Sequence, residues 1–317
     1  MAVGFDYPFR QSHRSDCLLY FWKKRTEDMS FYVKNLSKTF NDQVVVNDVS
    51  FELEHGRCVA LIGPNGAGKT TLLKMLTGLI AYKQGEISFQ KEKEWKQDIG
   101  FLPQVPYFYE WMTPEEFLRF VGGLSKMDEV LLSQRIKEVL TDTGLTDVRN
   151  KKIQGFSGGM KQRLGLAQAI LHEPALLFLD EPVSALDPVG RREVMSILSN
   201  LKAKTTILYS THVLHDAEEI SDDILLMKNG EIISHGTLEQ LLSQTSNVYV
   251  VESSSAFPAE NNFNLRLLKH NKAEVSFHSV EEKKQFLQWC VDQDINLVSF
   301  QENKQTLETL FMEAVKP

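Results

Sequence analysis

The sequence predicts an α/β fold with a largely parallel core sheet, followed by a small α+β domain. Short apolar segments alternate with helical segments from residue 58 to residue 228, which is typical of a parallel sheet covered by helices. A glycine-rich turn joins the first buried strand to a helix. A Ser- and Gln-rich stretch at residues 243–255 then separates this region from a second, smaller pattern of strands and helices.

The core elements follow one another in a regular order. Residues 31–36 form a first strand, and Val49, Phe51 and Leu53 alternate with polar residues as in a half-buried strand. Residues 58–62 form a buried strand that leads into a helix over residues 69–76. Later strands are expected at residues 85–89, 99–102, 175–180, 206–210, 224–228 and 231–235, and helices after Pro114, Asp128, Gly158, Pro188 and His212. The dipeptide Asn229-Gly230 predicts a hairpin turn between the last two strands.

The C-terminal region, residues 244–317, is predicted to form a separate α+β domain. Strands are expected at residues 248–251, 265–270, 273–278 and 296–300, with a helix over residues 280–291. Leu307, Leu310, Phe311 and Val315 form the apolar face of a last helix. No catalytic cluster is recognisable here, so packing, dimerisation and regulation are the roles left open.

Composition restricts the classes of protein and of partner. Apolar residues make up 42% of the 317, which suffices for well-formed cores, and a net charge of −7 gives no reason to expect nucleic acid as a partner. The three cysteines lack the spacings of metal or redox motifs, which indicates a reducing compartment. No apolar run reaches the roughly 18 residues of a membrane span. We therefore expect a cytosolic protein.

Residues 1–28 show no clear periodicity and precede Met29. We interpret them as an N-terminal extension, either flexible or the product of an upstream start codon, with a membrane-surface tether as the alternative.

Residues 63–70 fit the phosphate-binding pattern G-x-x-x-x-G-K-[ST]. The glycines let backbone N–H groups turn toward an anion, Lys69 adds a positive charge, and the Thr70 hydroxyl can ligate Mg²⁺. The nucleotide-binding residues expected here are Gly63, Pro64, Asn65, Gly66, Ala67, Gly68, Lys69, Thr70 and Thr71. A chance match, expected in about one chain of this length per hundred, is the alternative. The context of strand and helix favours binding of a nucleoside triphosphate.

A second glycine-rich helix start lies at residues 156–163, Phe-Ser-Gly-Gly-Met-Lys-Gln-Arg. Ser157 can cap the helix, and Gly158 and Gly159 expose backbone donors to an anion. This segment resembles LSGGQ, the signature of the nucleotide-binding subunits of ATP-binding cassette (ABC) transporters. Residues 176–179 form an apolar strand that ends in Asp180 and Glu181, which matches the family's Walker B element. The resemblance covers residues 31–242.

The resemblance implies a P-loop ATPase domain of ABC type over residues 29–243. Such a domain has a mixed core sheet, an antiparallel β subdomain and a helical subdomain, expected at about residues 105–170. The cofactors implied are ATP and Mg²⁺, and ATP is favoured over GTP because no Asn-Lys-x-Asp motif is present.

Catalytic roles also follow from the resemblance. Asp180 is expected to help hold Mg²⁺, together with Thr70 and Gln104, whose side chain reaches the metal or the attacking water. Glu181 is expected to polarise that water. His212 is expected to contact the γ-phosphate and Lys69 the phosphates. Without the resemblance, His212 would be interpreted as a cap of the following helix.

Two further residues are assigned with clear alternatives. Residues 184–187 resemble the D-loop, which crosses to a partner subunit, so Asp187 is expected near the nucleotide; the alternative is a turn before the helix that Pro188 opens. Phe40 occupies the place of the aromatic residue that stacks on adenine. A core phenylalanine on an edge strand is the alternative.

The family geometry implies two kinds of partner. Residues 157–159 of one subunit close on the ATP held by Lys69 of the other, which gives an ATP-dependent homodimer or a dimer with a paralogous cassette that hydrolysis reopens. A separate transmembrane permease subunit is expected as well, since the chain has no span of its own. The aromatic stretch at residues 106–112 is either its docking groove or packed within the helical subdomain.

Residues 155–169 and the tail at residues 306–311 resemble bacterial multidrug, antibiotic and sodium exporter ATPases, so export is favoured over import, at the cytosolic face of the membrane. The alternatives are a soluble ABC-type ATPase acting on nucleic acid or ribosomes, and a regulatory cassette. Residues 71–156 leave no room for a coiled coil, and Lys69, Asp180, Glu181 and His212 are all present. Both observations argue against these alternatives.

Overall fold

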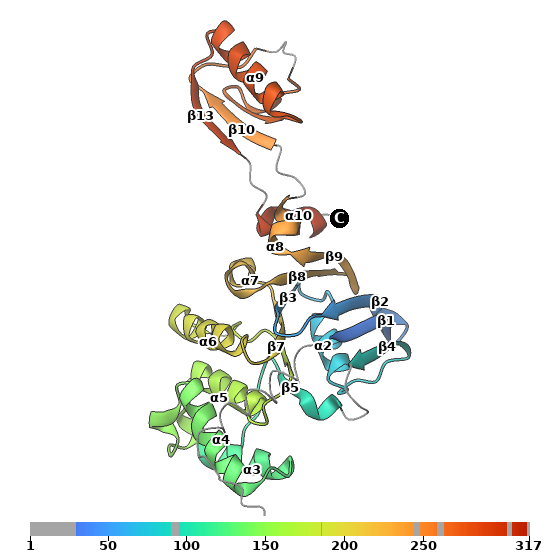
Figure 1. The fold of residues 1–317 in the computed structure, drawn as a ribbon, viewed down its shortest axis with the longest axis vertical. Helices are drawn as coiled ribbons and strands as arrows, with labels where there is room; N and C mark the ends of the chain where they lie inside the picture. Colours follow the sequence, from blue (N-terminus) through green and yellow to red (C-terminus); the bar gives the residue numbers. More distant parts are fainter. Residues whose placement is uncertain are drawn as a thin grey trace, which may run out of the picture. The chain divides into compact units, whose positions relative to one another are not determined.

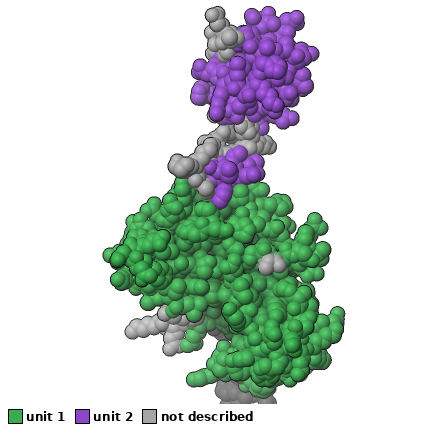
Figure 2. Space-filling model, turned by 180° about the vertical axis from the view of Figure 1, so that it is seen from behind, with its two compact units in different colours: residues 1–234 green, residues 235–317 purple. Residues whose placement is uncertain are grey.

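The computed structural model describes residues 30–89, 95–184, 186–243, 248–258, 263–302 and 306–315. The chain divides between residues 234 and 235 into two compact units, coloured separately in Figure 2. The predicted extension at residues 1–28 lies outside the described residues. The division falls within strand β9 (Glu231–Thr237), ahead of helix α8 (Leu238–Ser243), whereas the sequence placed it after residue 243. Helix α8 packs against α10 (Leu307–Val315), the last helix of the second unit, which explains this difference.

The first unit is built on a six-stranded sheet (Figure 1). Its strand order is β5 (Ile99–Leu102), β6 (Leu176–Leu179), β7 (Thr206–Thr211), β3 (Cys58–Ile62), β8 (Asp223–Lys228) and β9 (Glu231–Thr237). The pairs from β5 to β8 are parallel, as predicted. Strand β7 lies between β6 and β3, so the carboxyl ends of these three strands meet at one edge of the sheet.

A three-stranded antiparallel sheet forms the second layer of this unit. Its order is β2 (Gln43–Leu53), β1 (Phe31–Phe40) and β4 (Gln84–Phe89). Val49, Phe51 and Leu53 are buried, as their alternation predicts. Helix α2 (Lys69–Leu76) contributes four buried apolar residues to a core that contains strands of both sheets: Leu72, Leu73, Met75 and Leu76. Helix α2, which follows the glycine-rich loop, is thereby held in one core with strands of both sheets.

The helical subdomain follows β5. It contains α3 (Pro114–Leu124), α4 (Glu129–Asp142) and α5 (Gly158–Ile170), which pack against one another, with short 3₁₀ turns at Thr146–Val148 and Ile153–Gly155. A further 3₁₀ turn, Trp95–Asp98, precedes β5. Helix α3 begins at a capping box formed by Thr113 and Glu116, and Asp128 caps α4. Helices α6 (Pro188–Leu201) and α7 (Leu214–Ile220) return to the core, where α7 packs on β3 and β7.

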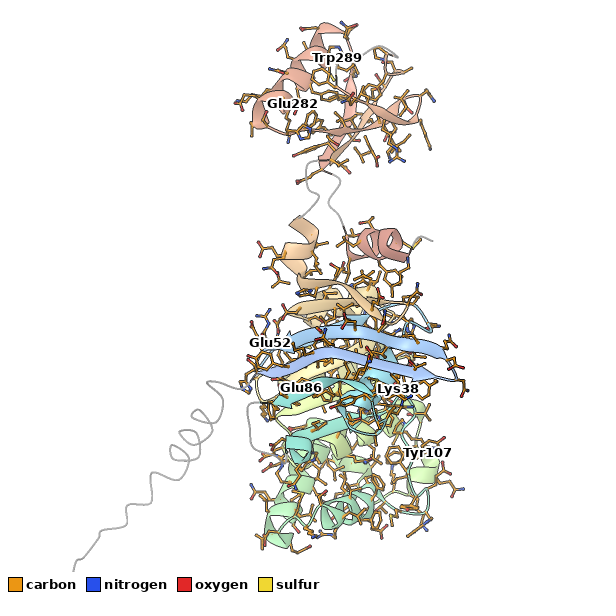
Figure 3. The ribbon with its side chains drawn as sticks, turned by 90° about the vertical axis from the view of Figure 1, so that its right-hand side faces the viewer. Lys38, Glu52, Glu86, Tyr107, Glu282 and Trp289 are labelled. Carbon is orange, nitrogen blue, oxygen red and sulfur yellow. The ribbon has the colours of Figure 1, made fainter. Side chains whose placement is uncertain are left out.

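The second unit is an α+β sandwich, as the sequence predicts. Its antiparallel sheet has the order β11 (Arg266–Lys269), β12 (Lys272–Ser276), β10 (Val248–Ser253) and β13 (Leu297–Glu302). Helix α9 (Val280–Asp292), which carries the labelled Glu282 and Trp289 in Figure 3, buries Phe286 and Cys290 in the core of this unit.

The two described cysteines are core residues. Burial raises the pKa of Cys58 to about 12 and that of Cys290 to about 11, so both thiols are inert near neutral pH. Within the described ranges, no helix combines the length and the apolar character needed to span a bilayer.

Candidate active site

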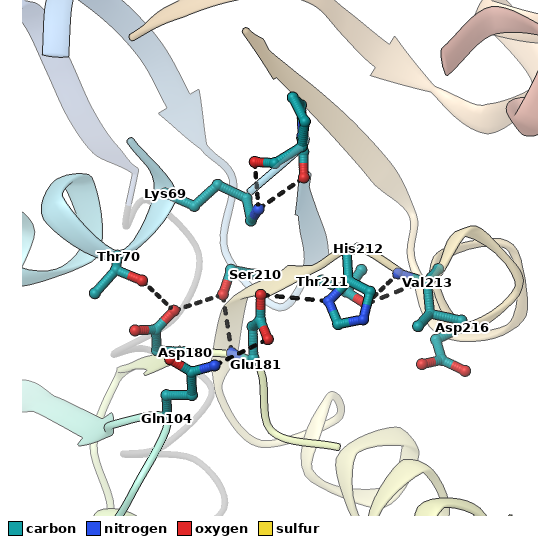
Figure 4. A network of polar contacts seen from close by, with 12 residues as sticks. Lys69, Thr70, Gln104, Asp180, Glu181, Ser210, Thr211, His212, Val213 and Asp216 are labelled. Atoms are coloured by element: carbon teal, nitrogen blue, oxygen red, sulfur yellow. Dashed lines mark hydrogen bonds and ion pairs between the residues drawn. The ribbon is translucent and has the colours of Figure 1, made fainter. Parts of the chain in front are cut away.

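The predicted phosphate loop, the paired acids and the histidine follow three neighbouring strands of the core sheet (Figure 4). Residues 63–68 follow β3, Asp180 and Glu181 follow β6, and His212 follows β7. Gln104 lies two residues beyond β5. The strand order brings these residues to one edge of the sheet, although they are far apart in the sequence.

Two glycines of residues 63–68, Gly63 and Gly68, are required by close approaches of the backbone. A Cβ on Gly63 would lie 2.3 Å from the Met227 carbonyl oxygen, and one on Gly68, at φ +106°, would lie 2.5 Å from the Val45 carbonyl oxygen. The N–H of Gly230, in the predicted hairpin turn, donates to the Ala67 carbonyl at 2.9 Å. The loop is therefore held against the strands that flank it.

Lys69 is buried against this loop. Only 6% of the residue is exposed, and its ammonium donates to the carbonyl oxygens of Gly63 (2.7 Å) and Pro64 (3.1 Å). Burial lowers the pKa of Lys69, whereas the nearby carboxylates of Glu181 and Asp180 raise it. The lysine is thus fixed at the mouth of the loop by contacts that a phosphate oxygen can replace.

Thr70 and Asp180 supply the oxygen atoms suited to Mg²⁺. The Thr70 hydroxyl donates to Asp180 Oδ1 at 3.1 Å, and Asp180 is 1% exposed. A hydroxyl and a carboxylate beside a phosphate loop form the kind of donor set that Mg²⁺ takes up with phosphate oxygens and waters. Gln104, the third expected ligand, instead donates through Nε2 to Glu181 Oε2 at 3.1 Å.

Glu181 lies between Gln104 and His212. His212 Nδ1 is 3.3 Å from Glu181 Oε1. The interpretation of His212 as a helix cap is wrong, because Val213 occupies the N-cap of α7 and no side chain caps that helix. The histidine and the amide together hold the Glu181 carboxylate at the sheet edge.

Ser210, on β7, is a member of the cluster that the sequence analysis missed. Its hydroxyl donates to Asp180 Oδ1 at 2.8 Å and accepts the Glu181 N–H at 2.9 Å. The available signal was a hydroxyl residue at the carboxyl end of a fully buried strand, two positions before His212.

The other predicted nucleotide-binding residues lie outside this cluster. Ser157 caps α5 by accepting the Met160 N–H, as predicted, and Asp187 caps α6 by accepting the Gly190 N–H at 2.8 Å. In the described part of the chain, no hydrogen bond or ion pair joins these residues, Gly158 or Gly159 to the cluster.

Phe40 is the last residue of β1 and is 41% exposed. The Lys38 ammonium lies 4.8 Å from its ring centroid. The alternative that Phe40 is a core residue of an edge strand is wrong, since the ring is exposed and β1 is the central strand of its sheet.

The sequence and the fold were compared with known proteins. The family model described as ABC transporter matches residues 46–184. The Bacillus subtilis ABC transporter ATP-binding protein YxlF is 42% identical over 290 residues, which cover 89% of this chain and 98% of YxlF. The chain belongs to the ABC transporter ATP-binding proteins. It is therefore the ATP-binding, ATP-hydrolysing motor subunit of a membrane transporter, a class that acts with a transmembrane component.

Two further ABC relatives extend the comparison. The linearmycin resistance ATP-binding protein LnrL of Bacillus subtilis is 31% identical over 299 residues, which cover 88% of this chain and 96% of LnrL. A solved structure titled as the ATP binding subunit of an ABC transporter is 34% identical, with a TM-score of 0.62, and covers 68% of this chain and 92% of that one. The alignment with LnrL is longer than the cassette and therefore includes part of the second unit.

Proposed function

We propose that this ABC subunit binds Mg²⁺ and ATP at the cluster around Lys69, and hydrolyses the ATP with Glu181 to drive export through a separate permease. The observation that carries this proposal is the convergence of the loop at residues 63–68, the Asp180–Glu181 pair and His212 at one edge of the core sheet.

Each residue of the cluster has a distinct task in the proposed reaction. Lys69 exchanges its two loop carbonyls for phosphate oxygens, which neutralises part of their charge. Thr70 and Asp180 hold Mg²⁺, which when bound offsets the charge that develops on the phosphates. Glu181 accepts a hydrogen bond from the attacking water and so orients and polarises it. Gln104 and His212 keep the Glu181 carboxylate in place.

The second glycine-rich helix start serves the nucleotide of a facing copy or paralogue. Ser157 and Gly158 are exposed at the N-terminus of α5. Backbone N–H groups at such an end favour an anion. The N-terminus of α5 closes on the γ-phosphate of that nucleotide, so the closed dimer binds ATP more tightly than ADP. Hydrolysis therefore favours reopening of the dimer. Asp187 approaches the same interface, and Phe40 stacks on the adenine.

The permease docks on an aromatic surface made of Tyr107, Tyr109, Trp111 and Phe120. Their exposed fractions are 88%, 49%, 64% and 40%, and Tyr107 is labelled in Figure 3. Tyr109 contacts the rings of Trp111 and Phe120, with centroids 6.0 and 5.6 Å apart. Exposed aromatic rings held in fixed positions are typical of protein interfaces.

The aromatic surface is linked to the helix that starts at Gly158. Glu110 lies between Tyr109 and Trp111 in the sequence and forms an ion pair with Lys161 of α5 at 2.7 Å. The Gln154 N–H donates to the Glu110 carbonyl at 3.0 Å. When α5 moves as ATP binds, these two contacts of Glu110 transmit the movement to the docked permease.

Export is the direction we propose, at the cytosolic face of the membrane, where ATP is supplied. The support is the likeness to LnrL, which is named for linearmycin resistance and aligns over both units.

The proposal is tested by purifying the chain with its membrane partner from detergent-solubilised membranes and reconstituting the complex in liposomes. We expect a multi-span protein to co-purify and Mg²⁺-dependent ATP hydrolysis that Lys69→Met abolishes. Hydrolysis that persists in Lys69→Met would overturn the assigned site, and the absence of any membrane partner would overturn the transport function.

A further inference from the structure

Ser210 occupies a position at the sheet edge where one hydroxyl contacts both acids. The residue is fully buried on β7. Its Oγ donates to Asp180 Oδ1 at 2.8 Å and accepts from the Glu181 N–H at 2.9 Å (Figure 4). Asp180 Oδ1 also accepts from the Thr70 hydroxyl. One oxygen of the Asp180 carboxylate is therefore occupied by two donors.

The backbone explains why a hydroxyl is needed here. The parallel pairing of β6 with β7 ends at Leu179 and Tyr209, and the Asp180 N–H turns to the Leu102 carbonyl on the other side. Glu181 then adopts φ +46°, in the left-handed region that a residue with a side chain rarely occupies. Its N–H leaves the ladder, and the Ser210 hydroxyl accepts it in place of a strand carbonyl.

We infer that Ser210 is a positioning residue for the ATPase reaction, a role that rests on the function proposed above. Its two hydrogen bonds fix the orientation of the Asp180 carboxylate, which would hold the metal, and fix the backbone of Glu181, whose carboxylate would orient the attacking water. Ser210 is fully buried and acts through the two acids that it contacts.

A merely structural role predicts a different result. A buried hydroxyl that only satisfies an N–H group contributes to folding stability, and its loss lowers the melting temperature without altering how the folded protein responds to Mg²⁺. A positioning role alters the Mg²⁺ dependence of the folded protein. The two roles are therefore separable by a metal titration.

The variants are Ser210→Ala, which removes the hydroxyl, and Ser210→Thr, which keeps it. Ser253→Ala is the matched control, because Ser253 is a buried serine in the second unit. Binding of a slowly hydrolysed ATP analogue is measured on the purified full chain in EDTA and across a Mg²⁺ titration, with melting temperatures and ATPase rates recorded in parallel.

For Ser210→Ala we expect analogue affinity in EDTA within about 2-fold of the unsubstituted protein, and a Mg²⁺ midpoint raised about 10-fold, the loss typical of a hydrogen bond to a charged group. Turnover falls at least as far. Ser210→Thr restores the midpoint, and Ser253→Ala leaves it unchanged.

An unchanged Mg²⁺ midpoint in Ser210→Ala would overturn the positioning role, whatever happens to its melting temperature. A midpoint that Ser210→Thr fails to restore would also overturn it, because packing rather than the hydroxyl would then be responsible. If the unsubstituted protein bound no nucleotide in the presence of Mg²⁺, the proposed function itself would fail, and that outcome is recognisable before any variant is compared.

Discussion

Removal of Arg191 is expected to destabilise the first unit, because it leaves the buried carboxylate of Asp216 without a counterion. Arg191 lies in the first turn of α6 and Asp216 in the first turn of α7. Nε and Nη2 of the arginine donate to Asp216 Oδ2 at 3.1 and 2.8 Å, and Asp216 is 2% exposed. Burial raises the pKa of Asp216, and the hydrogen bonds from Arg191 oppose that rise. The pair joins the helix after Asp187 to the helix after His212.

The expected loss follows from the burial of the carboxylate. Removal of one partner of a buried ion pair costs about 3–5 kcal/mol, because the remaining charge has no counterion. For a unit of roughly 200 residues, each kcal/mol lowers the melting temperature by about 2–4 °C, so Arg191→Ala is expected to melt about 6–20 °C lower. Adding Asp216→Asn in the same chain removes the unpaired charge and recovers much of the loss.

The pH dependence gives a sharper test. Without Arg191 the pKa of Asp216 rises further, so the folded state binds a proton that the unfolded chain releases above about pH 4. Stability contributed by this group is present at low pH and lost as the pH rises through the folded-state pKa. Unfolding by urea, followed by circular dichroism, is therefore expected to show a larger deficit of Arg191→Ala at pH 7.5 than at pH 5. A deficit below about 1 kcal/mol, or one equal at both pH values, would refute the reasoning.

Three further variants address the site and the docking surface. Lys69→Ala should weaken ATP binding about 10- to 100-fold, measured by equilibrium dialysis, because a charge-assisted contact is lost; unchanged affinity would contradict its assignment. Glu181→Gln should keep ATP binding, lose at least about 100-fold in turnover and accumulate an ATP-dependent dimer in light scattering; normal turnover would exclude its role in polarising water. Trp111→Ala should reduce co-purification of the permease about 30-fold with ATP affinity unaltered; equal recovery would remove Trp111 from the interface.

Each of these variants has a control in the chain. Lys269→Ala and Glu231→Gln are matched in charge change to Lys69→Ala and Glu181→Gln, and Val291→Ala removes an exposed apolar side chain from the second unit.

The sequence predicts the elements well wherever local chemistry specifies them. The phosphate loop, the helix cap at Ser157 and the Asn229-Gly230 turn each depend on residues within a few positions of one another. Most strands of both units lie within a few residues of their predicted positions, because apolar runs and alternation are local signals as well; β1 (Phe31–Phe40) and β2 (Gln43–Leu53) are longer than the sequence predicts.

The contacts that depend on how strands and helices are arranged could not be predicted from the sequence. Ser210 and Asp180 become neighbours only because β7 lies beside β6, and Arg191 meets Asp216 only because α6 packs on α7. Neither pair has a fixed spacing that a motif could record. The exposure of Tyr107 and the partial burial of its neighbour Phe108 likewise depend on how α3 packs, since the Phe108 ring contacts Phe117 of that helix.

The polar groups of the cluster are paired with one another in this structure, and this has a consequence for how nucleotide is bound. Lys69 contacts loop carbonyls, Glu181 contacts Gln104 and His212, and Asp180 contacts Thr70. On the proposed function, nucleotide binding would therefore exchange these hydrogen bonds for new ones, so its net gain would be smaller than the number of new contacts suggests. Gln104 and His212 are both exposed, so the Glu181 carboxylate that they contact lies on the solvent side of the cluster, where the proposed attacking water can reach it.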